Sequence, residues 1–147
     1  TLEGLIISFK FLKSKKEKKN ITRAIDYMID RIKSDKLPRT IYKNSISYME
    51  RIDIYAQFIR LILISRKKTT KKLYFTLKQN LIKIFKYKNN HKDLRIKGSI
   101  SWGKKNNGIK VKHANSWVSM FTYQCLMIYL ENFKKKQFFK NNFFLLI

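Results

Sequence analysis

Residues 50–65, ERIDIYAQFIRLILIS, form a segment that is apolar at most positions and polar along one line. Spacings of three, four and three residues place its polar members on one helix face. A helix that is apolar on its other sides packs against neighbours in several directions. Charged groups on such a helix need a partner or water, because an unpaired buried charge is costly. The segment therefore predicts a central helix with a polar line made of Glu50, Asp53, Gln57 and Arg60.

Two interpretations of this polar line stay open at the level of sequence. In the first, the line borders a cavity that holds water or a ligand, as isolated polar groups in functional sites often do. In the second, Glu50 and Asp53 only favour the N-terminus of the helix through its dipole, and Arg60 pairs locally with Gln57 or with solvent. The two interpretations differ in where the side chains point, which is a question for the structure.

Apolar residues at intervals of three and four predict further helices on both sides of this one. With only 4 glycines and 1 proline in 147 residues, a fold built on tight turns is disfavoured. We therefore expect one all-α domain over residues 1–147. The Lys-rich segment KSKKEKK and residues 34–45, which contain Pro38, are expected to connect helices. The expected helices cover residues 1–13, about 20–33, 48–66, 70–86 and 116–132.

A long irregular region, residues 86–115, separates the last two of these helices. Within it the segment LRIKGSISW alternates weakly between apolar and polar residues, which predicts a short strand or β-hairpin. Structureless loops of this length are uncommon in compact proteins and are usually either functional or disordered. We therefore expect this loop to contribute to a site.

The apolar pattern of the first two helices repeats, loosely, in the next two after a shift of about 49 residues. Each unit is a helix, a Lys-rich turn and a returning helix, which is typical of a solenoid or a closed ring of αα-hairpins. In such a ring, the polar line of residues 50–60 would face a central cavity. Both ends of the chain interrupt apolar patterns, so we expect a fragment whose parent chain continues upstream. Its open edges predict marginal stability and a tendency to associate.

Three segments resemble the later hairpins of an α/α-toroid protein: RAIDYMIDRIKSDKLPRTIY, YMERIDIYAQFIRLILI and IKGSISWGKKNNGIKVKHANSWVSMFTYQCLMIYLEN. The chain is similar there, over about residues 20–132, to the six-hairpin glycosidase-like domains of polysaccharide-related proteins. The shared features are a loop with a small strand before a Trp-bearing helix, and the ER-D--AQ opening of a helix. The resemblance implies a C-terminal arc of a toroid whose cavity faces a polysaccharide or oligosaccharide. It leaves open whether the chain is an enzyme.

Two carboxyl groups are the candidate catalytic residues of such a protein. Glycoside hydrolysis requires a pair of them roughly 5 to 10 Å apart. Only 9 residues of the chain are acidic, and Glu50 and Asp53 are the one close pair set in an apolar helix. By contrast, Asp26 and Asp30 lie on the polar face of their helix and are interpreted as solvated.

The remaining candidates are substrate-binding residues. Trp102 lies on a loop with glycines, where an aromatic ring can stack on a sugar. Trp117 lies in an apolar helix, where a tryptophan is more often a core residue. His113 is either a general acid or base or a loop and capping residue. The helix expected at residues 116–132 has a second polar stripe, formed by Ser116, Ser119 and Tyr123 at spacings of three and four. The candidate binding residues are Gln57, Arg60, Trp102, His113, Trp117 and Tyr123.

Several site classes lack their motifs in this sequence. It contains no Walker loop, no GxGxxG and no GxSxG. A single cysteine, Cys125, and two distant histidines form no metal-binding spacing, so we expect no metal and no cofactor. Cys125 is set in apolar sequence and is expected to be buried and inert. The sequence shows neither a signal peptide nor an apolar run long enough to span a membrane, so we expect a cytoplasmic protein.

The net charge is +25 with a pI near 10.3, which usually indicates a polyanionic partner. The excess is mostly lysine and accompanies many Ile, Asn, Phe and Tyr residues, whose codons are all A/T-rich. Genome composition is therefore an alternative explanation of the charge that requires no ligand. The alternative function is nonetheless a basic helical-repeat module that binds nucleic-acid backbone through KSKKEKK, SRKKTTKK and GKKNNGIKVKH. Against it stand the lack of interleaved aromatic residues and the scarcity of arginine. A third possibility is a structural fragment without activity.

Overall fold

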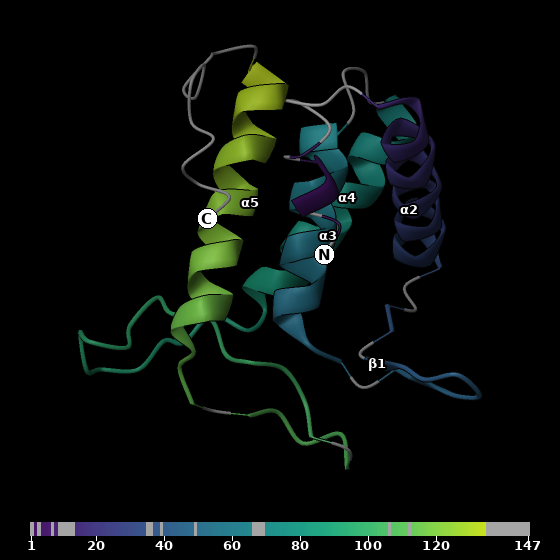
Figure 1. The fold of residues 1–147 in the computed structure, drawn as a ribbon. Coiled ribbons are helices and arrows are strands. Elements are labelled where there is room, and N and C mark those ends of the chain that lie inside the picture. Colours follow the sequence, from purple (N-terminus) through teal and green to yellow (C-terminus); the bar gives the residue numbers. More distant parts are fainter. Residues whose placement is uncertain are drawn as a thin grey trace.

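The fold was obtained as a computed structural model that describes residues 2, 4–6, 8, 14–34, 37–38, 40–48, 50–65, 70–105, 107–111 and 113–134. It confirms the predicted all-α class. The principal elements are α2 (Lys15–Lys33), β1 (Thr40–Ile41), β2 (Ile46–Ser47), α3 (Ile52–Ser65), α4 (Lys71–Phe85) and α5 (Ser116–Lys134), as Figure 1 shows. Within the described ranges, no helix is both long enough and apolar enough to cross a membrane.

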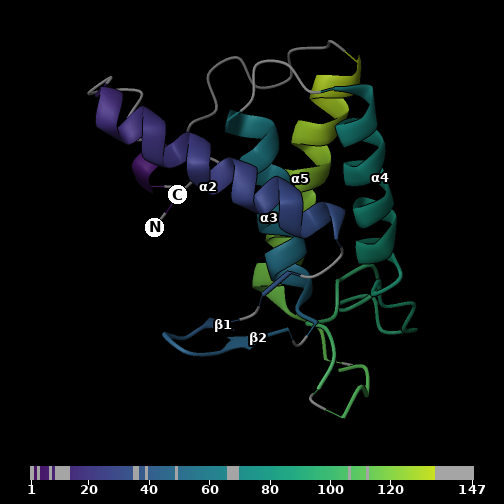
Figure 2. The same cartoon turned by 90° about the vertical axis from the view of Figure 1, so that its right-hand side faces the viewer.

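Helix α3 is the centre of the fold, as its apolar sequence predicts. It packs against α2, α4 and α5. In Figure 1, α5 lies on one side of α3 and α2 on the other, while Figure 2 shows that α2 crosses α3 at a steep angle. Ile52, Ala56, Ile59 and Ile62 are fully buried and lie at intervals of three and four residues. The core therefore surrounds α3.

Helix α2 begins at Lys15, several residues before the predicted start, so the prediction that KSKKEKK connects helices is wrong from Lys15 onward. Its lysines from Lys15 to Lys19 are exposed, as the prediction of a solvated segment requires. Lysine and glutamate are good helix formers, and their exposed side chains leave no apolar signal in the first turn. The buried side of α2 is the predicted one and includes Ile25, Met28 and Ile32. Of the helix predicted at residues 1–13, the described residues are all helical, and the rest lies outside the described part of the chain.

The region predicted as a loop at residues 34–45 contains strand β1, which pairs antiparallel with β2. The strands are only two residues long and Ile41 is exposed, so neither length nor burial marks them in the sequence. The bounds of α4 and α5 agree with those predicted. Helix α3 begins at Ile52, not at residue 48, because Glu50 and Arg51 pair with the long loop.

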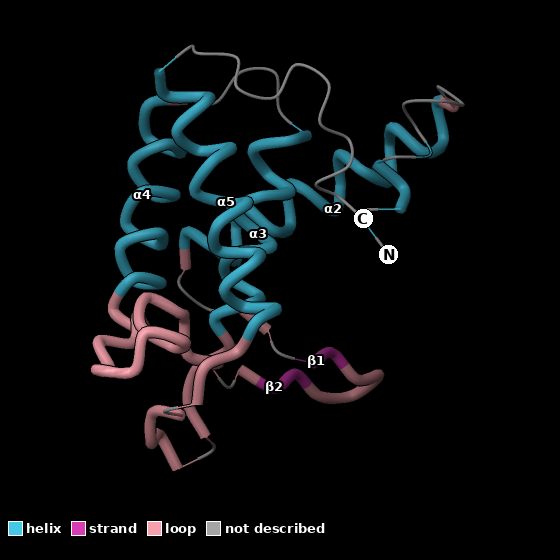
Figure 3. Tube along the Cα trace, turned by 90° about the vertical axis from the view of Figure 1, so that its left-hand side faces the viewer, coloured by secondary structure: helices cyan, strands magenta, loops and turns pink. Residues whose placement is uncertain are grey.

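The long loop, residues 86–115, folds under the end of the helices near the β-hairpin (Figure 3). Isolated antiparallel bridges join Lys88 to Ile100 and Ser101 to Ala114, which partly confirms the predicted strand character. A third bridge joins Arg51 to Gly103. There the amide of Ile52 donates to the carbonyl of Trp102 at 3.0 Å. The loop therefore fixes the N-terminal end of α3. The arrangement of the hairpins as an arc of a toroid stays a prediction.

Gly103 is the tightest point of this junction, and it generates a stability prediction. Its φ is +144°, and a Cβ at this position would lie 2.3 Å from the carbonyl oxygen of Glu50. We expect Gly103→Ala to lower the free energy of unfolding by about 3 kcal/mol, because both the backbone conformation and the contact become strained. Urea denaturation followed by circular dichroism measures this loss.

Gly108→Ala is the matched control. Gly108 also has a positive φ, +78°, but a Cβ there meets nothing within 4 Å. We expect this variant to lose only about 1 kcal/mol, the cost of the left-handed conformation. Equal losses in the two variants would contradict the close approach of the loop to residue 50.

Candidate functional site

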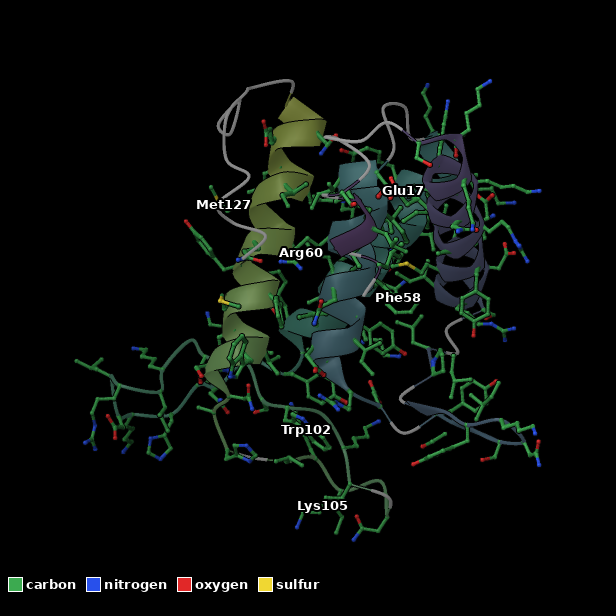
Figure 4. The ribbon with its side chains drawn as sticks, in the orientation of Figure 1. Glu17, Phe58, Arg60, Trp102, Lys105 and Met127 are labelled. Carbon is green, nitrogen blue, oxygen red and sulfur yellow. The ribbon has the colours of Figure 1, made fainter. Side chains whose placement is uncertain are left out.

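The predicted polar line of α3 divides between two different environments. Arg60 lies inside the helix bundle, between α3 and α5, as Figure 4 shows. Glu50 lies outside the helix, just before its first residue. Asp53 and Gln57 lie between them and are half-buried. The line therefore does not border one shared cavity along its length.

Arg60 is only 1% exposed. Its guanidinium donates a hydrogen bond to Oε1 of Gln124 on α5, and lies over the ring of Phe121 with Cζ 5.0 Å from the ring centroid. Gln124 is distant from Arg60 in the sequence, and the burial of Arg60 separates its guanidinium from solvent. Burial raises the pKa of the neighbouring Cys125 thiol well above its usual range, although the charge of Arg60 opposes this, and the thiol is inert as predicted.

Asp53 is held by a neighbouring arginine. Nε of Arg51 donates to Oδ1 of Asp53 at 3.0 Å, and a terminal nitrogen of Arg51 lies 2.5 Å from Oδ2. The same guanidinium stacks on the ring of Trp102, with Cζ 5.1 Å from the centroid. Trp102 is half-buried in the loops beneath the helices (Figure 4). Asp53 and Trp102 are therefore joined through Arg51.

Glu50 lines a cavity of about 500 Å³ at the junction of α4, the long loop and the start of α3. Among the predicted site residues, Glu50 alone lines this cavity. The other side chains in its wall are mostly basic. We refer to it as the lysine pocket, and its lining residues are Glu50, Gln79, Ile82, Lys83, Lys86, Tyr87, Lys104 and Lys110.

The carboxylate of Glu50 forms ion pairs with two of these lysines. Nζ of Lys104 lies 2.9 Å from Oε2, and Nζ of Lys83 lies 3.6 Å from Oε1. Lys83 also donates to the hydroxyl of Tyr55 at 2.9 Å. The two ammonium groups come from different elements, α4 and the long loop, so the carboxylate links these elements across the pocket.

Lys110 belongs to the same loop as Lys104, and the two residues form an isolated antiparallel bridge. Its ammonium group donates to the carbonyl of Lys86 at 2.5 Å and lies 4.5 Å from the centroid of the Tyr87 ring. Four lysines and one glutamate thus line the pocket, a net charge of four minus one, or +3. Such a concave positive surface attracts anions.

The pKa values of these groups follow from their neighbours. Partial burial raises the pKa of Glu50, but the hydrogen bond from Lys104 and the charge of Lys83 outweigh burial and hold this pKa below its usual value. The hydrogen bond to Glu50 in turn raises the pKa of Lys104. Burial and then the charge of Glu50 raise the pKa of Tyr87. At neutral pH Glu50 is therefore a carboxylate and Lys104 is a charged ammonium group.

The other predicted binding residues lie elsewhere. His113 is exposed on the long loop. Trp117 and Tyr123 are 66% and 59% exposed on α5, so the interpretation of Trp117 as a core residue is wrong. Apolar residues lie on several sides of helix α5, so its sequence pattern does not tell which side is buried. Trp117 instead contacts Phe121, with ring centroids 6.1 Å apart.

The residues that sequence reasoning missed are Lys83, Lys86, Tyr87, Lys104 and Lys110. Lys104 and Lys110 belong to the segment GKKNNGIKVKH, which was identified as basic but not as part of a pocket. Lys83 and Lys86 are three residues apart at the end of α4, a spacing that places both on one side of a helix. That signal is weak because lysines are so frequent in this chain.

Comparisons with known proteins add no family or fold assignment. No protein-family model matches the chain, and no curated protein or solved structure matches it either. Among the residues that the structure describes, no group of three or more His, Cys, Asp or Glu side chains is arranged to hold a metal ion. The function therefore has to be argued from the geometry of the lysine pocket itself.

The buried pair of Arg60 and Gln124 generates a second stability prediction. We expect Gln124→Leu to lower the free energy of unfolding by about 2 kcal/mol, because the buried guanidinium loses its hydrogen bond to the amide oxygen. The double variant Arg60→Met, Gln124→Leu replaces both partners by apolar groups of similar size and should recover at least about half of this loss. Urea denaturation of the two variants and the wild type measures both values. A double variant less stable than Gln124→Leu would be incompatible with this pairing.

Proposed function

We propose that the protein binds the phosphate backbone of a nucleic acid at the lysine pocket. The observation that carries the proposal is the convergence of Lys83, Lys86, Lys104 and Lys110 on a cavity that holds a single carboxylate. Lysine ammonium groups act as point charges that recognise phosphate without reading bases, so the expected binding is not sequence-specific. The high net charge of the chain supports long-range attraction of the same partner.

Glu50 has a defined role in this proposal. With no polyanion bound, its carboxylate pairs with Lys83 and Lys104 and reduces the repulsion between the ammonium groups. A phosphate group carries the same sign of charge and competes for these two lysines. Glu50 thus holds the lysines in place and also weakens binding by competing with the ligand.

A binding measurement with matched variants tests the proposal. The probe is a fluorescein-labelled single strand of twelve thymidine nucleotides, followed by fluorescence anisotropy. We expect Lys104→Gln, Lys110→Gln to weaken binding about 10-fold at about 0.1 M salt, because two phosphate contacts are lost. The control variant Lys19→Gln, Lys43→Gln removes the same charge from exposed positions on α2 and the β-hairpin and should stay within about 2-fold of the wild type. Equal weakening in both variants would show that net charge, not the pocket, binds the strand.

Glu50→Gln completes this experiment. The substitution removes the competing charge but keeps an oxygen that accepts a hydrogen bond, so we expect binding to become about 3-fold tighter. Weaker binding to the same strand would contradict the role given to Glu50.

Polysaccharide binding, implied by the resemblance to α/α-toroid proteins, is the second candidate function. One observation favours it: Trp102 precedes Gly103, which lies against the backbone of Glu50, so an aromatic ring and a carboxylate belong to adjacent segments. In a glycosidase, Glu50 would be the acid or nucleophile, and Glu50→Gln would abolish activity. Arg51 pairs with both carboxylate oxygens of Asp53, the second candidate catalytic residue. Polysaccharide processing therefore has less support than nucleic-acid binding.

A further inference from the structure

We propose that the nucleic acid is single-stranded and that one of its bases stacks on Phe75. This inference rests on the proposed function and names the class of ligand for the lysine pocket. Phe75 lies on α4 and is 63% exposed, so much of its ring is open to solvent. Exposed aromatic rings among basic side chains are the feature by which proteins bind unpaired bases.

The surroundings of Phe75 are basic. Lys71 and Lys72 precede it by four and three residues on α4, and Lys78 follows it by three. Residues at these spacings are neighbours on a helix surface, and all three lysines are exposed. A nucleotide stacked on Phe75 therefore has ammonium groups within reach of its phosphates. The Lys-rich connectors lack aromatic residues, but the exposed side of α4 provides one in Phe75.

A second hollow connects Phe75 to the lysine pocket. This hollow, of about 290 Å³, lies between α2 and α4, and its wall includes Phe75, Gln79 and Lys83. Gln79 and Lys83 also line the lysine pocket, so the two hollows adjoin. Together they form a track along α4 from Phe75 to Lys86. The eleven steps from Phe75 to Lys86, at a helical rise of about 1.5 Å each, span about 16 Å, the length of about five stacked nucleotides at about 3.4 Å each.

The charges along α2 set one end of this track. A third hollow, beside the start of α4, is lined by Lys33, Lys72 and the carboxylates of Asp26 and Asp30. These carboxylates repel phosphate, so we place the end of the strand at Phe75. At the other end, Ile82 is 45% exposed and lines the lysine pocket, where it offers an apolar surface to a base or a sugar.

Duplex and single-stranded nucleic acids expose different groups to a protein, and this difference favours a single-stranded ligand. In a duplex the base faces are already stacked on one another, and only the backbone is available to α4. An unpaired strand offers base faces to Phe75 and phosphates to the lysines at the same time. Removing the ring should therefore affect single strands and leave duplex binding unchanged, whereas removing pocket lysines should affect both.

The experiment compares Phe75→Leu, Phe75→Trp and Tyr42→Leu by fluorescence anisotropy. The probes are the labelled single strand of twelve thymidine nucleotides and a duplex of twelve base pairs. We expect Phe75→Leu to bind the single strand about 5- to 10-fold more weakly and the duplex as the wild type does. Phe75→Trp should bind the single strand at least as tightly as the wild type. Tyr42, 63% exposed on the β-hairpin, is an aromatic control of equal exposure, and its variant should behave as the wild type.

Other outcomes separate the two proposals. If the pocket-lysine variant binds weakly but Phe75→Leu binds the single strand normally, the stacking inference fails and the backbone-binding function stands. If the pocket-lysine variant also binds normally, the proposed function fails.

A basic helix with exposed apolar residues can also bind anionic membranes. If Phe75→Leu lowers binding to vesicles of phosphatidylserine and phosphatidylcholine but not to the single strand, a membrane surface replaces nucleic acid as the partner.

Discussion

The burial of α3 is the constraint on which the rest of the structure depends. This helix is apolar on so many sides that α2, α4 and α5 all pack against it. Its N-terminal end is then fixed by the long loop, which approaches so closely that only glycine fits at position 103. The same contact brings Lys104 to Glu50, and the packing of α4 on α3 brings Lys83 to the other carboxylate oxygen. The lysine pocket is thus a consequence of how the core is closed.

Electrostatic balance explains why this pocket can exist before a ligand binds. Four ammonium groups around one cavity repel each other, and a single carboxylate reduces that repulsion without removing the excess positive charge. Side-chain contacts also hold individual lysines: Lys83 lies 4.5 Å from the centroid of the Tyr55 ring, and Lys110 lies at the same distance from Tyr87. The pocket is therefore organised for an anion in advance, which lowers the entropic cost of binding.

Sequence alone predicted those features that depend on local periodicity. The bounds of α4 and α5 follow from apolar residues at intervals of three and four, and α3 was recognised as central from its composition. The start of α2 was missed because lysine-rich turns lack that periodicity. Arg60 illustrates the limit for tertiary contacts, since its partner Gln124 lies on another helix, far away in sequence. The sequence likewise indicates Glu50 as a candidate, but the lysines around it belong to segments whose meeting no local pattern encodes.

If codon composition alone explains the positive charge, no particular lysine is required for binding. The binding proposal instead requires the lysines of the lysine pocket. Lysine footprinting tests this most directly: the chain is acetylated with and without a single strand of twelve thymidine nucleotides, and modification at each lysine is measured by mass spectrometry. The account predicts that Lys83, Lys86, Lys104 and Lys110 are protected by the strand, together with Lys72 and Lys78 beside Phe75, while Lys19 and Lys43 remain reactive. Protection spread evenly over the basic surface, or concentrated on α2 and the β-hairpin, would contradict it.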